Sequence, residues 1–327
     1  LLRLEKMANT DRSVISRENT EFYDRTLLYR AVAYFVHTKF GQVRDIPRNG
    51  GTNTIKFRRY GNLTAATTAL SEGVTPSGSQ LSVTDITATV AQYGDYITIT
   101  DVIDYESKDP VLIEAAEILG DQAGDTLDQL TRDVLAAGTV VTYVGQSDRA
   151  SITTSNLITA TEVRKAIRTL KNAKARRITR MIDASTGIAT EPVAAAYIGL
   201  CHPDTTFDLQ DETGWVPVEK YASTMPIMEN EVGKINEVRF IESTNCKVFS
   251  GAGASSIDVY ATLIMGSDAY GLTRISGEAL KNIVKPLGSA GTADPLDQRA
   301  TSGWKATFVA KILNDSFMVR LEHAVSS

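Results

Sequence analysis

The sequence predicts an α+β fold in which a β-rich excursion precedes one long helix. Three observations lead to this prediction. Within residues 52–101, apolar and polar side chains alternate before and after a loop that is rich in Thr, Ser, Ala and Gly. Residues 109–137 repeat apolar side chains every three or four positions, as an amphipathic helix does. From residue 191 onward, short apolar runs are separated by Gly, Ser and Asn, as in a domain of short strands and turns.

Bulk composition narrows the class of protein. Of the 327 residues, 43% are hydrophobic and 22% are charged, which is the balance of a folded globular protein. The longest apolar runs are too short to cross a bilayer, so no membrane partner is expected. The formal net charge of −5 argues against a general nucleic-acid binder but allows a local basic face. Cys201 and Cys246 form no CxxC pair and are expected to be free thiols.

The N-terminal part contains one predicted helix. Thr20 is a suitable cap for a helix that starts near Glu21 and ends before Gly41. Its aromatic and aliphatic side chains, Phe22 and Leu27 among them, form an apolar face. Such a face fits the core of a globular domain, or an arm that packs on a neighbouring subunit.

The β-rich excursion is built from three predicted strands. The first is residues 52–60, where apolar and polar side chains alternate. Residues 63–80 have neither a helical nor a strand period. The other two strands are predicted at Val83–Gln92 and Tyr96–Thr100, joined by a turn at Tyr93–Asp95. A loop of this length inside a compact domain is uncommon and usually has a function.

The helix at 109–137 has the clearest signals in the chain. Asp109 is a good N-cap, Pro110 fits the first helical position, and Gly138 follows the end. One face is an apolar stripe. The opposite face is acidic, and it is either a solvated surface or an interface for a basic partner. Its acidic residues are Glu114, Glu117, Asp121, Asp125 and Asp128.

A second, basic helix is predicted at residues 161–180. Thr161 is its expected cap, and Glu162 is its only acid, so its charge is not neutralised within the segment. The basic side chains can face solvent, an acidic neighbour, or the phosphates of a nucleic acid. They include Arg164, Lys165, Arg168, Lys171, Lys174, Arg176 and Arg177.

The remainder of the chain reads as short strands. "VAAAYIGLCHPDT" is a buried strand that runs into a turn, and "EVRFIESTNCKVF", "SIDVYATLIMG" and "AYGLTRI" are further strands. Near the C-terminal end, Trp304–Ala310 and Phe317–Glu322 are predicted to form an antiparallel pair that turns at Asn314–Asp315.

A search for catalytic chemistry finds one cluster, in "CHPDTTFD". Cys201, His202 and Asp204 lie close together, but adjacent strand residues point to opposite faces, which disfavours a Cys–His nucleophile pair. The cluster also lacks a second ligand group at metal-site spacing. No phosphate loop, dinucleotide loop or hydrolase motif is present in the sequence. We therefore expect no catalytic, cofactor or metal site, with a hydrolase at this cluster as the least favoured alternative.

Several segments in order resemble the major capsid proteins of tailed phages of the phage N-4-like family. Two of these segments, residues 70–104 and 109–139, contain much of the β-rich excursion and the long helix. "HPDTTFDL", "PIMENEVGKINEVRFIES", "SDAYGLTRI" and "KPLGSAGTADPLDQRATSGWKATFVAKILND" follow, and residues 21–61 precede them. The resemblance covers nearly the whole chain.

This resemblance implies a Hong Kong 97-type capsid fold with four parts. The implied boundaries are an N-terminal arm at 1–45, an extended β-hairpin loop at 46–101, a peripheral domain at 102–160 with its spine helix at about 109–137, and an axial domain at 161–295. Residues 296–327 would return to the peripheral domain as strands.

The resemblance also implies function and partners. The protein would be a non-enzymatic major capsid protein that forms hexamers and pentamers of an icosahedral head around double-stranded DNA. It would assemble in the bacterial cytoplasm with a scaffolding protein, a portal and a decoration protein, and would touch DNA weakly. A nanocompartment shell of the encapsulin type is the alternative. The expected contacts between subunits are Phe22, Tyr23, Leu27, Glu72, Gly73, Pro76, Gln80, Glu114, Glu117 and Asp121, and the basic residues at 164–177 face DNA or another subunit.

Overall fold

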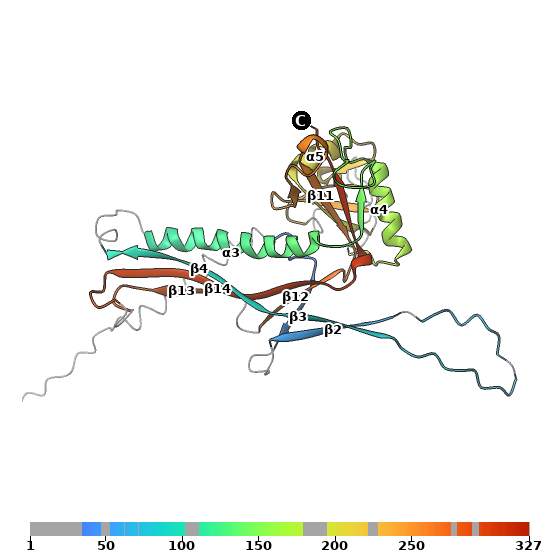
Figure 1. Cartoon of the computed structure of the whole chain (residues 1–327), viewed down its shortest axis with the longest axis horizontal. Helices are drawn as coiled ribbons and strands as arrows, with labels where there is room; N and C mark the ends of the chain where they lie inside the picture. Colours follow the sequence, from blue (N-terminus) through green and yellow to red (C-terminus); the bar gives the residue numbers. More distant parts are fainter. Residues whose placement is uncertain are drawn as a thin grey trace, which may run out of the picture. The chain divides into compact units, whose positions relative to one another are not determined.

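The computed structural model describes residues 35–46, 53–61, 63–70, 72–101, 111–178, 195–221, 228–275, 280–289 and 294–326 (Figure 1). These residues belong to two compact units. Unit 1 takes its described residues from Leu1–Lys39, Ala91–Arg132 and Gly277–Phe308. Unit 2 takes its described residues from Phe40–Val90, Asp133–Ser276 and Val309–Ser327. The predicted N-terminal helix lies largely outside the described residues.

Unit 1 is a three-stranded antiparallel sheet covered on one face by a helix. The strands are β4 (Ala91–Thr100), the first ten residues of β14 (Arg299–Ile312), and β13 (Leu280–Lys285). The covering helix is α3 (Val111–Ala136), whose residues up to 132 belong to this unit. The sheet and α3 share an apolar cluster of Leu119, Ala123, Leu127, Trp304 and Ala306.

Helix α3 confirms the predicted long amphipathic helix. Its bounds agree with the prediction within two residues, although the proposed cap Asp109 and Pro110 lie outside the described residues. Leu119 and Ala123 from the predicted stripe are fully buried. The local period of 3.6 residues sets the apolar face, which is why sequence alone could find it.

The C-terminal end of α3 is capped from a distant strand in unit 2. The helix has no basic residue in its last turn. The Arg320 guanidinium donates instead to the carbonyl oxygens of Ala136 and Gly138, and its Nε donates to Glu322 Oε1 at 2.7 Å. Glu322 also accepts from Arg149 at 2.6 and 2.7 Å. A cation at this end interacts favourably with the helix dipole.

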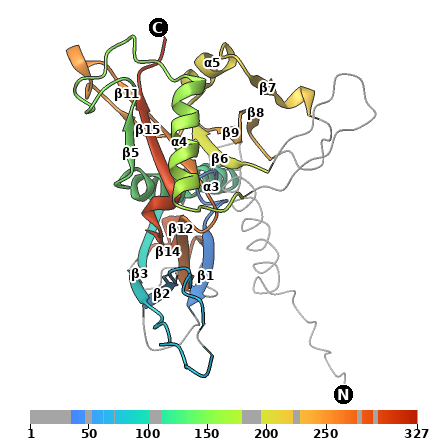
Figure 2. The ribbon, with the colours of Figure 1, turned by 90° about the vertical axis from the view of Figure 1, so that its right-hand side faces the viewer.

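The main sheet of unit 2 has eight strands of mixed direction (Figure 2). Its path runs β5–β15–β11–β6–β9–β8–β7, with β10 paired to β11. The bounds are β5 (Val141–Tyr143), β15 (Met318–His323), β11 (Val259–Met265), β6 (Tyr197–Cys201), β9 (Val238–Glu242), β8 (Glu231–Ile235), β7 (Trp215–Pro217) and β10 (Val248–Phe249).

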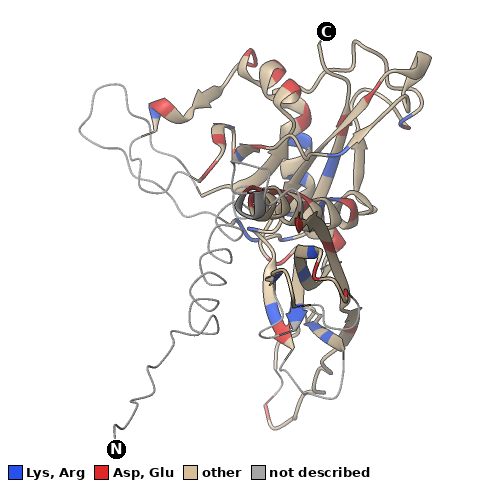
Figure 3. Cartoon of the chain, turned by 90° about the vertical axis from the view of Figure 1, so that its left-hand side faces the viewer, with Lys and Arg blue, Asp and Glu red and all other residues tan. Residues whose placement is uncertain are grey.

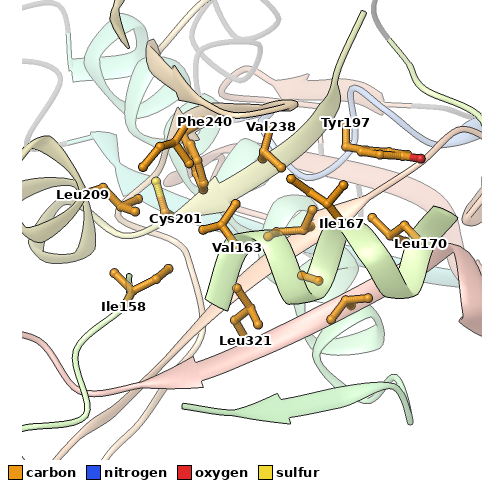
Figure 4. Packing of buried hydrophobic residues seen from close by; sticks show 14 of the residues in the cluster. Ile158, Val163, Ile167, Leu170, Tyr197, Cys201, Leu209, Val238, Phe240 and Leu321 are labelled. Atoms are coloured by element: carbon orange, nitrogen blue, oxygen red, sulfur yellow. The ribbon is translucent and has the colours of Figure 1, made fainter. Parts of the chain in front are cut away.

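Two helices complete this part of unit 2. Helix α4 (Ala160–Asn172) packs its buried stripe of Val163, Ile167 and Leu170 into the core cluster that the sheet provides (Figure 4). Helix α5 (Pro203–Gln210) follows β6 directly. Short 3-10 turns occur at Val218–Lys220, Ala254–Ser256 and Asp315–Phe317. No helix among the described residues is long and apolar enough to span a membrane.

Unit 2 also contains a smaller sheet and a separate two-stranded ribbon. Strand β1 (Gln42–Ile46) pairs in parallel with β12 (Tyr270–Ile275), and β12 pairs antiparallel with the last residues of β14. The ribbon is β2 (Thr54–Tyr60) and β3 (Val83–Thr89), antiparallel over seven residue pairs. The extended β-hairpin is therefore present, with residues 61–82 between its strands.

The predicted turn at Tyr93–Asp95 is wrong. These three residues lie inside β4, and the break between β3 and β4 falls at Val90. Strand β3 pairs with β2, whereas β4 pairs with β14. Gly94 was interpreted as a turn glycine, but it allows close approach of strands, since a Cβ there would lie 2.6 Å from the carbonyl oxygen of Trp304.

The predicted C-terminal strand pair is also wrong. β14 and β15 belong to different sheets, and neither pairs with the other. The residues after Ile312 lead through the 3-10 turn into β15, which lies between β5 and β11. Two short apolar runs separated by Asn-Asp look like a hairpin locally, but buried partners far along the chain decide the pairing.

Two details of α4 correct the sequence reading. The cap is Thr159, whose hydroxyl accepts from the Glu162 N–H, and the expected cap Thr161 is already within the helix. The helix ends at Asn172, so Lys174, Arg176 and Arg177 follow it rather than continue it. Lys174 has a positive φ of 57°, a conformation that ends a helix.

Candidate interaction surfaces

The tip of the β2–β3 ribbon is fully exposed. Every described residue between 61 and 82 is exposed and none belongs to a strand, and the backbone bond from Gly61 N to Ser82 O closes the base at 2.9 Å. The predicted contact residues Glu72, Gly73, Pro76 and Gln80 all lie in this segment.

The tip carries apolar side chains beside its one acid. Leu70 is 78% exposed and Val74 is 65% exposed. Between them Glu72 and Gly73 form a turn, and Gly73 has a φ of +76°, which favours glycine. The tip thus presents two exposed apolar side chains, one on each side of its turn.

The acidic face of α3 is only partly exposed. Glu114 is exposed, whereas Glu117 and Asp121 are half-buried. Figure 3 shows the acidic residues of the chain in red and the basic residues in blue. Asp128, which sequence reasoning assigned to the same face, is instead fully buried. Its carboxylate accepts from the backbone N–H groups of Val36 and His37 and lies 2.7 Å from His37 Nδ1.

The basic segment at 164–177 is partly neutralised, contrary to the sequence expectation. Glu237, in the turn between β8 and β9, accepts from Lys171 Nζ and from Arg177 at 2.6 Å each. Burial alone would raise the pKa of Glu237, but these two cations outweigh it and hold the pKa below its usual range. Lys165 pairs with Glu162 at 2.6 Å.

The rest of the basic segment keeps its charge at the surface. Arg164 donates to the Thr161 hydroxyl. Arg168, Lys174 and Arg176 are exposed, and within the described part of the chain their side chains form no ion pair. The segment therefore contains exposed cations beside three cations that are paired with carboxylates.

Phe22, Tyr23 and Leu27 lie outside the described residues. The proposed contacts of the N-terminal arm therefore stay predictions.

The cluster in "CHPDTTFD" is built as a strand end and a helix start. Cys201 is the last residue of β6 and is fully buried, and this burial raises the pKa of its thiol to about 12. His202 caps α5, where its Nδ1 accepts from the Asp204 N–H at 3.3 Å. Asp204 accepts from the Tyr260 hydroxyl at 2.8 Å. A thiol that stays protonated and buried is not a nucleophile.

Other possible sites are few in the described part of the chain. There, no three His, Cys, Asp or Glu side chains group together as a metal site requires. Cys246 is buried and, like Cys201, is a free thiol, as predicted.

One surface that sequence reasoning missed lies on the outer face of the unit 1 sheet. A hollow of about 480 Å³ is lined by β4, β13 and β14, and Tyr96 and Ile283 line it. Both face away from α3, because Ile97, next to Tyr96, and Leu280, three residues before Ile283, pack in the core cluster, and alternate strand residues face opposite sides. The alternation was visible in the sequence, but the register that brings Tyr96, Gly303 and Ile283 side by side was not.

Several solved structures with the same fold are phage capsids. The capsid of Ralstonia phage GP4 matches with a TM-score of 0.70 and 13% identity, over 89% of this chain and 89% of that chain. The capsid of cyanophage P-SCSP1u matches with a TM-score of 0.63 and 14% identity, over 89% and 88%. At these identities the likeness shows a common fold, which confirms the predicted α+β capsid fold of the Hong Kong 97 type.

An encapsulin also shares the fold, at a lower TM-score. The SrpI encapsulin complex from Synechococcus elongatus matches with a TM-score of 0.52 and 10% identity, over 99% of this chain and 93% of that chain. No curated protein sequence matches this chain. The family described as phage capsid protein matches residues 83–321, well over half of the chain. The chain therefore belongs to the phage capsid protein family and is a major capsid protein.

Proposed function

We propose that copies of this chain form hexamers and pentamers that close into an icosahedral head around double-stranded DNA. The observation that supports this most is the family match over residues 83–321, together with a capsid fold that covers 89% of this chain and of its phage relative. The ordered segments identified in the sequence support the finer assignment to an N-4-like tailed phage. Assembly would take place in the bacterial cytoplasm.

In this proposal the subunit has four parts, each with its own role in assembly. We assign residues 1–45 to an arm, 46–101 to the extended loop, 102–160 with 296–327 to a peripheral domain, and 161–295 to an axial domain. Three strands depart from these bounds, because β4 and β13 lie in the unit 1 sheet and β15 lies in the main sheet of unit 2. The exposure of every described residue at 61–82 supports a loop that lies on a neighbouring subunit. Such contacts are heterologous, and they close into rings when the rotation between copies allows it.

The remaining partners follow from the same role. A scaffolding protein, a portal and a decoration protein would associate with the shell, and Phe22, Tyr23 and Leu27 would pack the arm on a neighbour. The free cations Arg168 and Lys174 would face another subunit or make weak, sequence-independent contacts with DNA phosphates. Weak contacts suit the inner surface of a head, because packaged DNA must later leave it.

Electron microscopy of the purified protein with its scaffold tests this proposal. Closed particles with five-fold and six-fold capsomers are expected, and a protein that stays monomeric under all assembly conditions refutes it. The nucleic-acid content of particles from infected cells separates a phage head from the alternative suggested by the encapsulin match, a nanocompartment that encloses protein cargo.

A further inference from the structure

The hollow on the outer face of the unit 1 sheet has an apolar centre. Tyr96, Gly303 and Ile283 lie side by side on β4, β14 and β13. Tyr96 is 68% exposed and Ile283 is 43% exposed. Gly303 forms the floor between them, and a Cβ there would lie 2.7 Å from Tyr96 Cβ, so a larger residue would fill the space. Large side chains left open beside a glycine floor suit the insertion of apolar groups.

Cations stand at both ends of this apolar centre. Lys305 and Lys285 line the same hollow, each two residue pairs from the Gly303–Ile283 pair, on opposite sides of it. Alternate residues of a strand face the same side, so both lysines lie on the outer face with Ile283. Among the described residues neither lysine forms an ion pair. The hollow is therefore an apolar slot with two lysines. Asp95 also lines it, but its carboxylate already accepts from Gln122 and from the Tyr96 N–H.

The sheet holds this slot in a fixed shape. Trp304 points to the other face, where its Nε1 donates to Gln122 Oε1 at 3.0 Å. Gln122 Nε2 in turn donates to Asp95 Oδ2 at 2.7 Å. The hydrogen bond from Gln122 and that from the Tyr96 N–H lower the pKa of Asp95, which stays an anion. The strands that carry Tyr96 and Gly303 are thus tied to α3, and a preformed slot loses little entropy on binding.

The ribbon tip offers the complementary chemistry. Leu70 and Val74 are exposed apolar side chains, and the carboxylate of Glu72 lies between them in the sequence. Glu72 is exposed, and among the described residues it forms no ion pair. The tip is therefore apolar with one negative charge, and the slot is apolar with two positive charges.

We propose that the slot between Tyr96 and Ile283 receives the Leu70–Val74 turn of a second copy of this chain, with the Glu72 carboxylate between Lys285 and Lys305. This inference rests on the proposed assembly function and names the receiving surface for the loop. Duplex DNA is the poorer occupant, because it binds chiefly through phosphates and gains nothing from an apolar slot with a glycine floor.

Disulfide trapping tests the contact directly. Val74→Cys combined with Thr301→Cys places one thiol on the turn and one at the edge of the slot. A disulfide requires the two Cα atoms to approach within about 7 Å. Native Cys201 and Cys246 are buried and do not interfere. We expect a ladder of linked subunits from assembled particles on non-reducing gels.

The controls are the two single variants and Val74→Cys with Phe207→Cys, an exposed position on α5. None of these should form the ladder. A disulfide within one subunit, or no ladder from well-formed particles, overturns the inference.

Charge exchange tests the same contact without cysteines. Glu72→Lys alone, and Lys285→Glu with Lys305→Glu, should each lower the fraction of protein that sediments as particles by about tenfold, because like charges then meet. The triple variant should recover most of that loss. Circular dichroism of the unassembled subunit verifies that each variant is folded.

The outcomes separate the two levels of the proposal. If the wild-type chain forms no particles, the assembly function fails. If the wild type assembles and Glu72→Lys assembles equally well, only the slot assignment fails. If the lysine variants assemble normally but retain less DNA, the slot faces nucleic acid and the inference is wrong.

Discussion

Replacing Asp128 should destabilise unit 1 more than any surface change on α3. The Asp128 carboxylate accepts from the N–H groups of Val36 at 2.9 Å and His37 at 2.7 Å, and it lies 2.7 Å from His37 Nδ1. Both Asp128 and His37 are completely buried. Asp128→Ala leaves these polar groups without their partner. Each unsatisfied buried group costs about 1–3 kcal/mol, and breaking a buried pair costs about 3–5 kcal/mol in total.

Asp128→Asn separates charge from hydrogen bonding. The amide oxygen can still accept both backbone N–H groups, and the amide nitrogen can donate to His37 Nδ1 in its other tautomer. We therefore expect a loss of only about 1 kcal/mol. Glu114→Ala, an exposed change on the same helix, is the matched control and should stay within about 0.5 kcal/mol.

Urea unfolding of the unassembled subunit measures these differences. The chain has two tryptophans, and Trp304 packs in the same cluster as Leu127 of α3. A Trp215→Phe background makes the fluorescence report unit 1 alone. If Asp128→Ala unfolds at the same urea concentration as Glu114→Ala, the carboxylate does not hold residues 36 and 37. If Asp128→Asn is as damaging as Asp128→Ala, the charge matters and not the hydrogen-bond geometry.

Four further outcomes follow from particular contacts. Arg320→Ala should lower the urea midpoint, with a loss of about 3–5 kcal/mol, because it uncaps α3 and removes a partner of buried Glu322; equal stability to wild type would contradict this. Burial lowers the pKa of His323 to about 4, so its contribution to stability is complete above pH 6.5 and is lost as pH falls toward 4, by at most about 1.4 kcal/mol per pH unit; acid titration of His323→Gln should lack this component. Cys201, with a pKa of about 12, should react with a thiol reagent only after denaturation, and rapid reaction of the native protein would be inconsistent with its burial. Deleting 64–79 should keep cooperative melting but abolish particles, and loss of melting would show that the loop stabilises its own subunit.

The elements that sequence predicted well are those set by local periodicity. The apolar stripe of α3 and the apolar–polar alternation of β2 depend on residues only a few positions apart, so the local sequence pattern predicts both elements. The exposed loop between β2 and β3 could also be predicted from the sequence, because its apolar residues recur with neither a helical nor a strand period. The capsid identity came from the order of many short segments rather than from any one of them.

The errors concern pairings and charges that act across the fold. Gly94 was taken for a turn because glycine signals both turns and close strand contacts, and only the partner β14 distinguishes them. The basic segment was judged to be unneutralised because Glu237, which pairs with Lys171 and Arg177, lies 60 or more residues away. Asp128 was placed on a solvated face because its partners near His37 are 91 positions distant. Long-range partners leave no local pattern.

The loop and the slot belong to one chain, and this fixes the kind of assembly they can support. A contact between a turn on one copy and a slot on the next is heterologous, so each copy can use one turn and one slot. In a closed ring every turn and every slot is then occupied, whereas an open chain leaves one of each exposed to water. Closure therefore removes the last exposed apolar turn, with Leu70 at 78% exposure, and the last unpaired lysines at Lys285 and Lys305. In the proposed head, the rotation between copies would decide whether five or six copies close a ring, and Gly73, with its φ of +76°, would let the turn adapt to either.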